Sequence, residues 1–565
     1  MLWQRLLSAS FFLVNFVDVS SSSTVGSDQV ALSQQSRDHA SLSNANQSCG
    51  DGVLLIGPIR DSLALMQDEY YQIWIGTWPT AIDWTAAVVN TIVTSTLSTF
   101  SGYLSHLSRT ELARQHVFEQ VENEINLYFA HNIGFYFAEN AFNIRNEAYD
   151  DMLWVVRGWL ESVKFIDEYT LSRTSLNKTG CAWYGCQYVA AFSHRARVFY
   201  DLASQGWDTK LCGGGMTWNP HLIPYKNAIT NQLFISASIG MYLYFPGDDN
   251  NSPYLAEQSG HTHRPGRPHD ERFLQAAING YDWLRASNMT NEFGLYVDGY
   301  HITDWSQKNR TGSGKCDERN EMVFTYNQGV ILSGLRGLYT ATGEHQYLED
   351  GHRLVRNVMN ATGWRGSRDE SINAANGQWQ GLGRAGILED YCDHKGDCSQ
   401  DSQTFKGIFF DHLVQFCKSL SPRMPGHDLA VLHRQSCLAY GVWVEHNAQG
   451  ALRNRDSKGR FGSFWGDLET HNTPVDLPRG ALDYRNDKTV LRSRQWSGSI
   501  QDKSSTVQVE VRDPEVGLIQ YSESMSGHGI ADSWTGPNDR GRGRTVETQV
   551  AGLSIVRAAW ELNRL

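Results

Sequence analysis

The sequence predicts an all-α protein in which pairs of helices close into a ring, and three observations lead to this fold class. Apolar residues recur at three- and four-residue spacing in many successive segments from about residue 60 onward, which is the period of an amphipathic helix. Strand-like alternation is scarce, and its best case is the short run Thr506–Val511. No repeat of fixed length and consensus is present, which disfavours an open helical solenoid relative to a closed ring.

The expected helices follow one another along the chain, with Gly, Pro and Asn clusters between them. A last helix, Thr545–Leu562, is expected to dock back on the core. Two polar segments, 246–270 and 495–543, indicate loop insertions rather than separate domains. In chain order, the other expected helices are Trp84–Leu107, Leu112–Phe129, Met152–Ile166, Val189–Leu202, Asn227–Tyr244, Arg272–Ala286, Thr325–Thr340, Tyr347–Met359, Phe405–Leu420 and Asp428–His446.

Composition fits a large globular protein and disfavours nucleic acid as a partner. Of the 565 residues, 41% are hydrophobic and 19% are charged, and the net charge is −12. Phosphate binding needs clustered Lys and Arg, and the sequence has no long basic run. We expect residues 59–565 to form one domain with loop insertions, and we expect the protein to be a monomer.

The first residues predict secretion. Arg5 precedes an apolar run, Leu6–Val17, which is too short to span a bilayer comfortably and resembles a signal peptide over residues 1–22. Residues 23–58 are Ser-rich and are expected to be disordered. No later stretch predicts a stable membrane span, and the C-terminus lacks the pattern of a GPI anchor.

Sequons and cysteines agree with secretion into an oxidising compartment outside the cell. The chain has nine cysteines, of which Cys392 with Cys398, and Cys181 with Cys186, each bracket a short loop and form candidate disulfides. Cys49 is a candidate for the unpaired ninth cysteine. N-glycosylation sequons occur at Asn46, Asn177, Asn250, Asn288, Asn309 and Asn360.

Two adjacent acids, Asp150 and Asp151, are the central candidate site. They stand before an apolar, Trp-rich helical stretch, in the sequence Tyr-Asp-Asp-Met-Leu-Trp. Neighbouring side chains on a helix diverge by about 100 degrees, so the two carboxyl groups can reach the separation of about 5–5.5 Å associated with retaining glycosidases. Two carboxylates this close split their proton affinities, which leaves one as a nucleophile and one as an acid. The structural alternative is a pair of acids that cap the first turn of a helix.

Other polar and aromatic motifs supply candidate binding residues. The segment Cys-Gly-Gly-Gly-Met-Thr-Trp-Asn-Pro at 212–220 lets the backbone turn tightly or approach a ligand, and Trp218 in it can stack on a sugar. Loop histidines at 261, 263 and 269 match no standard metal site, so we expect them to be solvated, and we expect no metal and no cofactor. The candidates for sugar stacking are Trp84, Trp218 and Tyr326, and those for hydroxyl contacts are Asn231, Asp298 and Asn327.

Taken together, these motifs resemble glycoside hydrolase family 76, and in particular its fungal branch. The resemblance rests on WPTAIDWT at 78–85, AYDDMLW at 148–154, CGGGMTWNP at 212–220, KNAITNQLF at 226–234, FTYNQG at 324–329 and CSQDSQTFKGIFF at 398–410. It implies an (α/α)6 barrel and a retaining endo-α-1,6-mannosidase. It also implies that Asp150 is the nucleophile and Asp151 the acid and base.

The expected substrate is therefore an α-1,6-mannan backbone or another mannose-bearing glycan. The resemblance also leaves open a wall transglycosidase that transfers GPI-linked mannan glycans to wall glucan. A non-catalytic mannan-binding wall protein and an (α/α)6 enzyme with another polysaccharide substrate are further alternatives. The intact aspartate pair argues against the former, and the CGGGMTWNP and FTYNQG motifs argue against the latter.

Overall fold

Six helices of the described residues form a closed inner ring in the computed structural model of the chain. The structure describes residues 56–107, 112–176, 183–250, 266–306, 312–366, 377–420, 427–467, 475–487 and 536–565. Each inner helix packs against the next along the chain, and the last packs against the first. These helices are α2 (Asp83–His106), α5 (Tyr149–Leu176), α7 (Ala228–Tyr244), α10 (Tyr326–Thr342), α13 (Gln400–Cys417) and α16 (Val546–Leu562).

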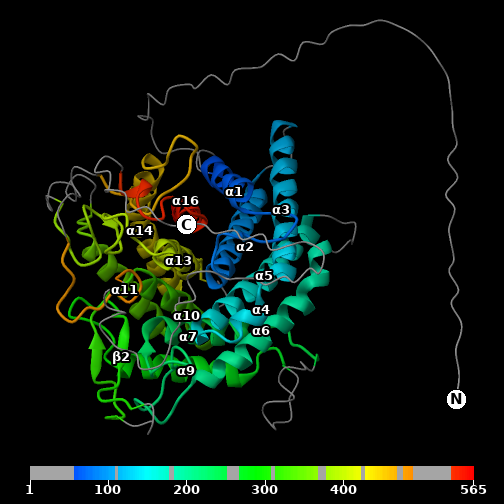
Figure 1. Cartoon of the computed structure of the whole chain (residues 1–565). Coiled ribbons are helices and arrows are strands. Elements are labelled where there is room, and N and C mark those ends of the chain that lie inside the picture. The colour runs from blue at the N-terminus through cyan, green and yellow to red at the C-terminus, as the bar shows by residue number, and fades with distance from the viewer. Residues whose placement is uncertain are drawn as a thin grey trace, which may run out of the picture. The chain divides into compact units, whose positions relative to one another are not determined.

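A second set of helices covers this ring from outside. Each packs mainly on one inner helix, and α14, like α1, packs mainly on α16 and only slightly on α13. The outer helices are α1 (Ile56–Tyr70) on α16, α3 (Leu112–Ala138) on α2, α6 (Val189–Ala203) on α5, α9 (Glu271–Ala286) on α7, α11 (His345–Ala361) on α10, and α14 (His427–Arg453). The predicted (α/α)6 barrel is thereby confirmed, and Figure 1 shows the C-terminal helix α16 next to α1, α2 and α13.

Burial explains which helices are inside. Every residue of α7 from Ala228 to Met241 is buried, which suits a helix packed on all sides. The outer helix α11 instead buries one stripe, which includes Leu348, Val355 and Val358, and leaves charged residues on its other face. The inner ring therefore lies at the centre of the core, and the outer helices add their apolar stripes to it.

Short strands lie at the edge of the barrel, near the starts of inner helices. The strands β1 (Lys226–Asn227), β2 (Gly299–His301) and β3 (Glu318–Asn320) form an antiparallel sheet in this order, and β1 leads directly into α7. The strands β4 (Gly383–Arg384) and β5 (Ile387–Leu388) form a hairpin. The remaining short elements are α4 (Ala141–Ile144), η1 (Tyr184–Tyr188), η2 (Ser204–Gly206) and η3 (Pro537–Asp539).

Three disulfides join described residues. The predicted Cys392–Cys398 bond is present, and Cys212–Cys316 and Cys417–Cys437 are pairs that loop spacing alone does not suggest. The predicted Cys181–Cys186 bond is wrong, because Cys186 has a free thiol. Its Sγ lies 3.2 Å from Thr170 Oγ1 on α5 instead.

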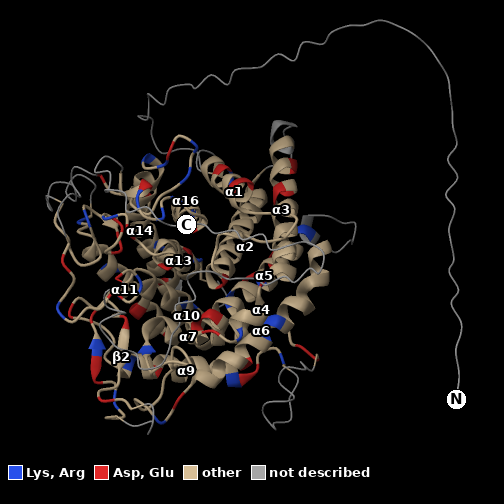
Figure 2. Ribbon diagram, in the orientation of Figure 1, with Lys and Arg blue, Asp and Glu red and all other residues tan. Residues whose placement is uncertain are grey.

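Several sequence predictions fall outside the described residues. These are the signal peptide, the Ser-rich segment up to residue 55, the short strand Thr506–Val511, and most of the two polar insertions. No helix of the described residues combines the length and apolar character needed to cross a membrane. Lysine and arginine are spread over many elements rather than gathered on one, as Figure 2 shows.

Candidate active site

The first turns of the inner helices bring the predicted site residues together. At the start of α2, Trp84 Nε1 donates a hydrogen bond of 2.9 Å to Asp401 Oδ1, in the first turn of α13. Thr85 Oγ1 lies 2.9 Å from Glu547 Oε1, in the first turn of α16. The N-terminus of a helix carries a partial positive charge, so this end of the barrel favours carboxylates.

Asp150 lies in the first turn of α5 and is buried, with 4% of its surface exposed. Its Oδ1 atom has no hydrogen-bond partner among the described residues. Burial raises the pKa of Asp150 to about 6, while the charge of Arg485 and hydrogen bonds from backbone N–H groups and the Trp218 indole act in the opposite direction. A buried polar atom without a partner is costly, and such an atom is a candidate for contact with a ligand.

Asp151 differs from its neighbour in environment and in proton affinity. Its Oδ2 accepts a hydrogen bond of 3.1 Å from the backbone N–H of Ala148, the residue before α5. One oxygen therefore has the capping role that the structural alternative assigns to it. Burial, followed by the charges of Asp150 and Glu147, raises the pKa of Asp151 well above its usual range. At neutral pH, Asp150 is thus the residue of the pair that ionises more readily.

Arg485 brings a positive charge to this group of acids. Its Nη2 donates a hydrogen bond of 3.3 Å to the hydroxyl of Tyr326, at the start of α10. Its guanidinium carbon lies 5.7 Å from the centre of the Trp218 ring. The nearby Tyr326, Asp401 and Asp150 keep the pKa of Arg485 well above its ordinary value, although burial opposes this.

Asp298 lies among polar side chains near the starts of α7 and α10. Its Oδ2 accepts a hydrogen bond of 2.6 Å from the Tyr225 hydroxyl, and its Oδ1 lies 3.4 Å from Asn327 Nδ2. Asn320 Nδ2 lies 3.4 Å from Oδ2. Burial raises the pKa of Asp298, against hydrogen bonds from Tyr225 and Asn327 and the charge of Arg485. The Oδ1 atom of Asn327 is buried without a hydrogen-bond partner among the described residues.

The candidate aromatic residues are held in different ways. Trp84 is 9% exposed, and its ring lies parallel to that of Trp154 at 5.9 Å. Tyr326 is 2% exposed and stacks on Phe405 at 3.8 Å. Trp218 is only partly buried, so it has the most surface of the three candidates to offer a sugar ring.

Asn231 holds the loop that carries Trp218. Its Oδ1 accepts a hydrogen bond of 2.7 Å from the backbone N–H of Met216, and its Nδ2 donates to the carbonyls of Met216 and Asn227 at 3.2 and 2.8 Å. In the same loop Gly215 has φ +84°, and a Cβ there would lie 2.5 Å from the Trp283 ring. The glycine triplet thus allows a tight turn against Trp283, which holds the loop close to the barrel.

Sequence analysis did not single out Arg485, Asp401 or Glu147 as site residues. Asp401 lies in the motif at 398–410, but the motif alone does not indicate that this residue belongs to the site. Glu147 lies beside the aspartate pair, and burial raises its pKa to about 7. Arg485 lies in a segment with no periodic pattern, so nothing in the sequence connects it with Asp150.

Two other features of the described residues do not involve the aspartate pair. Two clusters of side chains have the residue types of metal ligands. They are His352, His433 and Cys437, and Cys392, Asp393 and Cys398. Every cysteine in them forms a disulfide, so its thiolate is not available to bind a metal. A cavity of about 250 Å³ lies among α9, α10 and α11. None of the predicted site residues lines it, so the chemistry described above gives it no role.

Comparison with known proteins finds a family profile that matches part of the chain. Residues 189–258 and 267–454 match the profile of glycosyl hydrolase family 76. The aspartate pair precedes these residues in the chain. The protein is 28% identical over 222 residues to the mannan endo-1,6-α-mannosidase DFG5 of Saccharomyces cerevisiae. The aligned residues make up 38% of this chain and 36% of DFG5. DCW1 of the same yeast, which has the same enzyme name, is 25% identical over 38% and 37% of the two chains. The matches thus span just over a third of each relative.

Solved structures also align with the chain. The GH76A α-1,6-mannanase of Salegentibacter sp. HEL1_6 aligns over 90% of this chain and 99% of its own, with 16% identity and a TM-score of 0.44. Dfg5 from Chaetomium thermophilum, solved with glucosamine, aligns over 74% and 86%, with 14% identity and a TM-score of 0.43. Less than half of the chain therefore matches the glycosyl hydrolase family 76 profile, and part of the chain is similar to fungal proteins named mannan endo-1,6-α-mannosidases.

Proposed function

We propose that this protein is a retaining endo-α-1,6-mannosidase whose reaction is carried by Asp150 and Asp151. One observation carries the proposal: two adjacent carboxyl groups lie at the start of an inner helix, and Oδ1 of one is buried without a partner among the described residues. The names of the yeast relatives supply the substrate class. The protein acts outside the cell or in the cell wall.

The first step forms a covalent intermediate. An oxygen of ionised Asp150 attacks C1 of the mannose, and the bond from C1 to the departing O6 breaks. Asp151 gives its proton to that O6, so the leaving mannose departs as a neutral alcohol. The difference in proton affinity between the two residues suits these roles, because Asp151 holds its proton at a pH at which Asp150 is ionised.

The second step releases the intermediate. Asp151, now ionised, takes a proton from water, and the water oxygen attacks C1 from the face that the leaving group vacated. The bond from C1 to Asp150 breaks, and the product keeps the α configuration after two inversions. A sugar hydroxyl that replaces water would give the transglycosidase reaction by the same step.

The surrounding side chains orient the sugar. Trp218 offers an aromatic face, and Asp298 and Asn327 offer polar groups to hydroxyls. Tyr326 and Trp84 line the same end of the barrel and are candidates for additional stacking. Asn231 contributes indirectly, since its amide holds the loop of Trp218.

Chemical rescue tests the two roles separately. With an aryl α-mannoside as substrate, Asp150→Ala plus azide should give β-mannosyl azide, because azide replaces the nucleophile. Asp151→Ala plus azide should give α-mannosyl azide, because azide then attacks the intermediate in place of water. Each variant alone should lose about 10²–10⁴-fold or more in kcat on α-1,6-mannan. The matched control is Asp282→Asn, an exposed aspartate on the outer helix α9.

Other outcomes distinguish the alternatives. Full activity of both alanine variants would reject the assignment. Binding of oligomannose by wild-type protein without turnover would indicate a mannan-binding protein. Products longer than the substrate, formed when an acceptor oligosaccharide is added, would indicate a transglycosidase.

A further inference from the structure

Arg485 belongs to a short irregular stretch, residues 475–487, which we call the arginine segment. The segment follows the residues that match the family profile. It has no helix or strand of its own, so its geometry must come from contacts with the rest of the barrel. An arginine side chain has large rotamer freedom, and holding it in one place requires fixed partners on both sides.

The first anchor of the arginine segment is Asn320 at the end of β3. Its Oδ1 accepts a hydrogen bond of 2.8 Å from the backbone N–H of Leu482, and its Nδ2 donates one of 3.0 Å to the carbonyl of the same residue. The side chain thus pairs with one backbone unit much as a neighbouring strand would. It fixes the chain three residues before Arg485.

The second anchor is Asn486. Its Oδ1 accepts a hydrogen bond of 2.7 Å from the backbone N–H of Ser399. Its Nδ2 donates to both carboxylate oxygens of Asp483, at 3.1 and 2.9 Å. The same Asp483 Oδ1 accepts from the backbone N–H groups of Arg485 and Asn486. The turn around Arg485 is therefore closed by Asp483 and tied to the barrel by Asn486.

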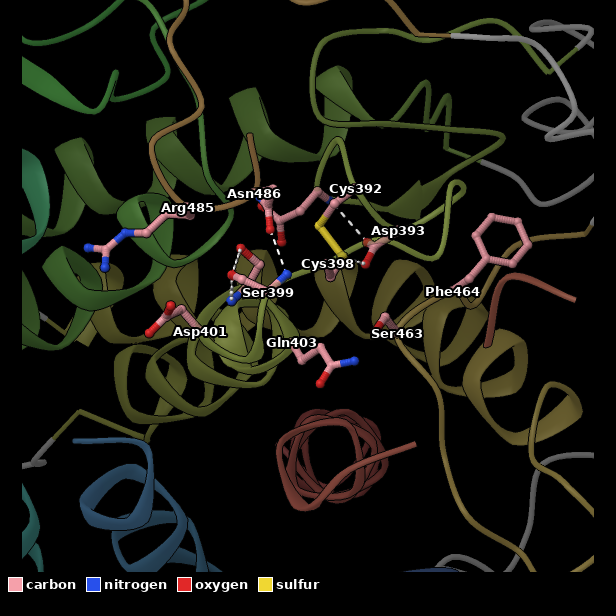
Figure 3. Close-up of a disulfide and its surroundings, with 12 residues drawn as sticks. Cys392, Asp393, Cys398, Ser399, Asp401, Gln403, Ser463, Phe464, Arg485 and Asn486 are labelled. Carbon is pink, nitrogen blue, oxygen red and sulfur yellow. Dashed lines mark hydrogen bonds between the residues drawn. A yellow bond between two sulfur atoms is a disulfide. The ribbon is translucent and has the colours of Figure 1, made fainter. Parts of the chain in front are cut away.

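Ser399 is a rigid point of attachment. It is the N-cap of α13, and its hydroxyl accepts a hydrogen bond of 3.2 Å from the backbone N–H of Ser402. It directly follows Cys398, whose disulfide with Cys392 closes a short loop. Figure 3 shows Asn486 turned toward Ser399, whereas Arg485 and Asp401 extend away from the disulfide. The start of α13 thereby places both the Asp401 carboxylate and, through Asn486, the Arg485 guanidinium.

We propose that Asn486 is a positioning residue, which ties the arginine segment to the N-cap of α13 and so holds the Arg485 guanidinium beside Trp218, Tyr326 and the aspartate pair. The inference rests on the proposed function in one respect, namely that Asp150 acts as the nucleophile. A fixed cation favours the ionised form of Asp150 over the protonated form. A displaced arginine would leave Asp150 harder to ionise, and the enzyme would need a higher pH to reach full activity.

The test compares Asn486→Ala with Arg485→Met and with the double variant. Asn486→Ala should raise deuterium uptake in peptides from residues 475–487. It should also lower kcat/KM by about 10- to 100-fold and shift the acidic limb of the pH profile to higher pH. Arg485→Met should shift that limb in the same direction. In the Arg485→Met background, Asn486→Ala should have little further effect on kcat/KM, because its effect acts through the arginine.

Asn454→Ala is the matched control. Asn454 is also partly buried, and its amide donates to the carbonyls of Gly450, Trp465 and Gly466. Its loss should lower the melting temperature but leave the pH profile in place. Multiplicative losses in the double variant, or an unshifted acidic limb in Asn486→Ala, would overturn the proposal.

Deuterium uptake separates this inference from the proposed function. If the wild-type protein does not cleave α-1,6-mannan, the proposed function fails, and uptake alone then decides the positioning role. Unchanged uptake over residues 475–487 in Asn486→Ala would overturn that role, whatever the activity. Increased uptake there, with unchanged uptake in peptides from α5 and α10, would support it.

Discussion

At the scale of single residues, proton affinity distinguishes two chemically identical side chains. Asp150 and Asp151 share a helix turn, yet they meet different charges. Burial raises the pKa of both residues and the charge of Arg485 lowers it, but the pKa of Asp151 is raised further by the negative charges of Asp150 and Glu147. Like charges disfavour a second ionisation, and an opposite charge favours it. The proposed roles of nucleophile and acid follow from this asymmetry.

The asymmetry predicts a bell-shaped pH profile. Activity needs Asp150 ionised, and because its pKa is about 6, kcat/KM should rise as the pH increases through about 6. Activity also needs Asp151 protonated, so kcat/KM should fall at higher pH as that proton is lost. With an aryl mannoside that needs no acid, Asp151→Asn should keep the rising limb and lose the falling one. A falling limb that persists in Asp151→Asn would assign it to another group.

The sequence indicated the aspartate pair as the candidate site, but it did not indicate the charged residues around the pair. Adjacent acids before a Trp-rich helix are visible in a linear pattern. Arg485 lies more than 300 residues further along the chain, and only the closed ring brings it to Asp150. The sequence also does not show how much of each side chain is exposed to solvent. It therefore grouped Trp84, Trp218 and Tyr326 as candidates, although Trp84 and Tyr326 are buried and Trp218 is only partly buried.

At the scale of elements, helical periodicity located the helices, whereas caps set where they begin. The segment predicted at Phe405–Leu420 begins at Gln400, because Ser399 caps it and the first turn is polar. That turn carries Asp401. Similarly, α5 begins at Tyr149, before the apolar stripe from Met152. Polar first turns weaken the periodic pattern where site residues gather, so the site lies at the least predictable part of each helix.

Asn231 provides a test at this scale, because its amide joins α7 to the loop of Trp218. Asn231→Ala should lower the free energy of unfolding by about 1–3 kcal/mol, since the backbone groups of Met216 lose their partner in a buried place. Chemical denaturation with the wild-type protein as reference measures this. A variant with unchanged stability but a raised KM would instead indicate direct contact with a sugar hydroxyl.

At the scale of the whole molecule, closure of the ring depends on the last helix. The periodicity of the sequence predicted a ring of helix pairs and a last helix that docks back on the core, but it did not predict α1 or the inner helices on which the last helix packs. In the structure α16 packs against α13 and α2. Arg557 of α16 and Asp411 of α13 form an ion pair in which each side chain is 3% exposed.

This buried ion pair allows a prediction of how much the contact between α16 and α13 contributes to the free energy of unfolding. Arg557→Met should destabilise the protein by about 3–5 kcal/mol, because it leaves the Asp411 carboxylate buried without its partner charge. Replacement of both residues, as in Arg557→Met with Asp411→Leu, should recover part of that loss. The matched control is Arg353→Ala, whose pair with Asp350 lies on the outer helix α11 with the arginine side chain 62% exposed. It should cost about 0–1 kcal/mol, and equal losses in the two single variants would contradict the proposed role of burial.

The central claim is a double displacement by the aspartate pair on an α-1,6-mannosidic bond. Proton NMR of the anomeric region, recorded during the first minutes of hydrolysis of linear α-1,6-mannan, tests it most directly. We expect the new reducing ends to appear first as the α anomer and to reach the equilibrium mixture later by mutarotation. Initial release of the β anomer would contradict a retaining mechanism, and the absence of new reducing ends would contradict the proposed hydrolysis.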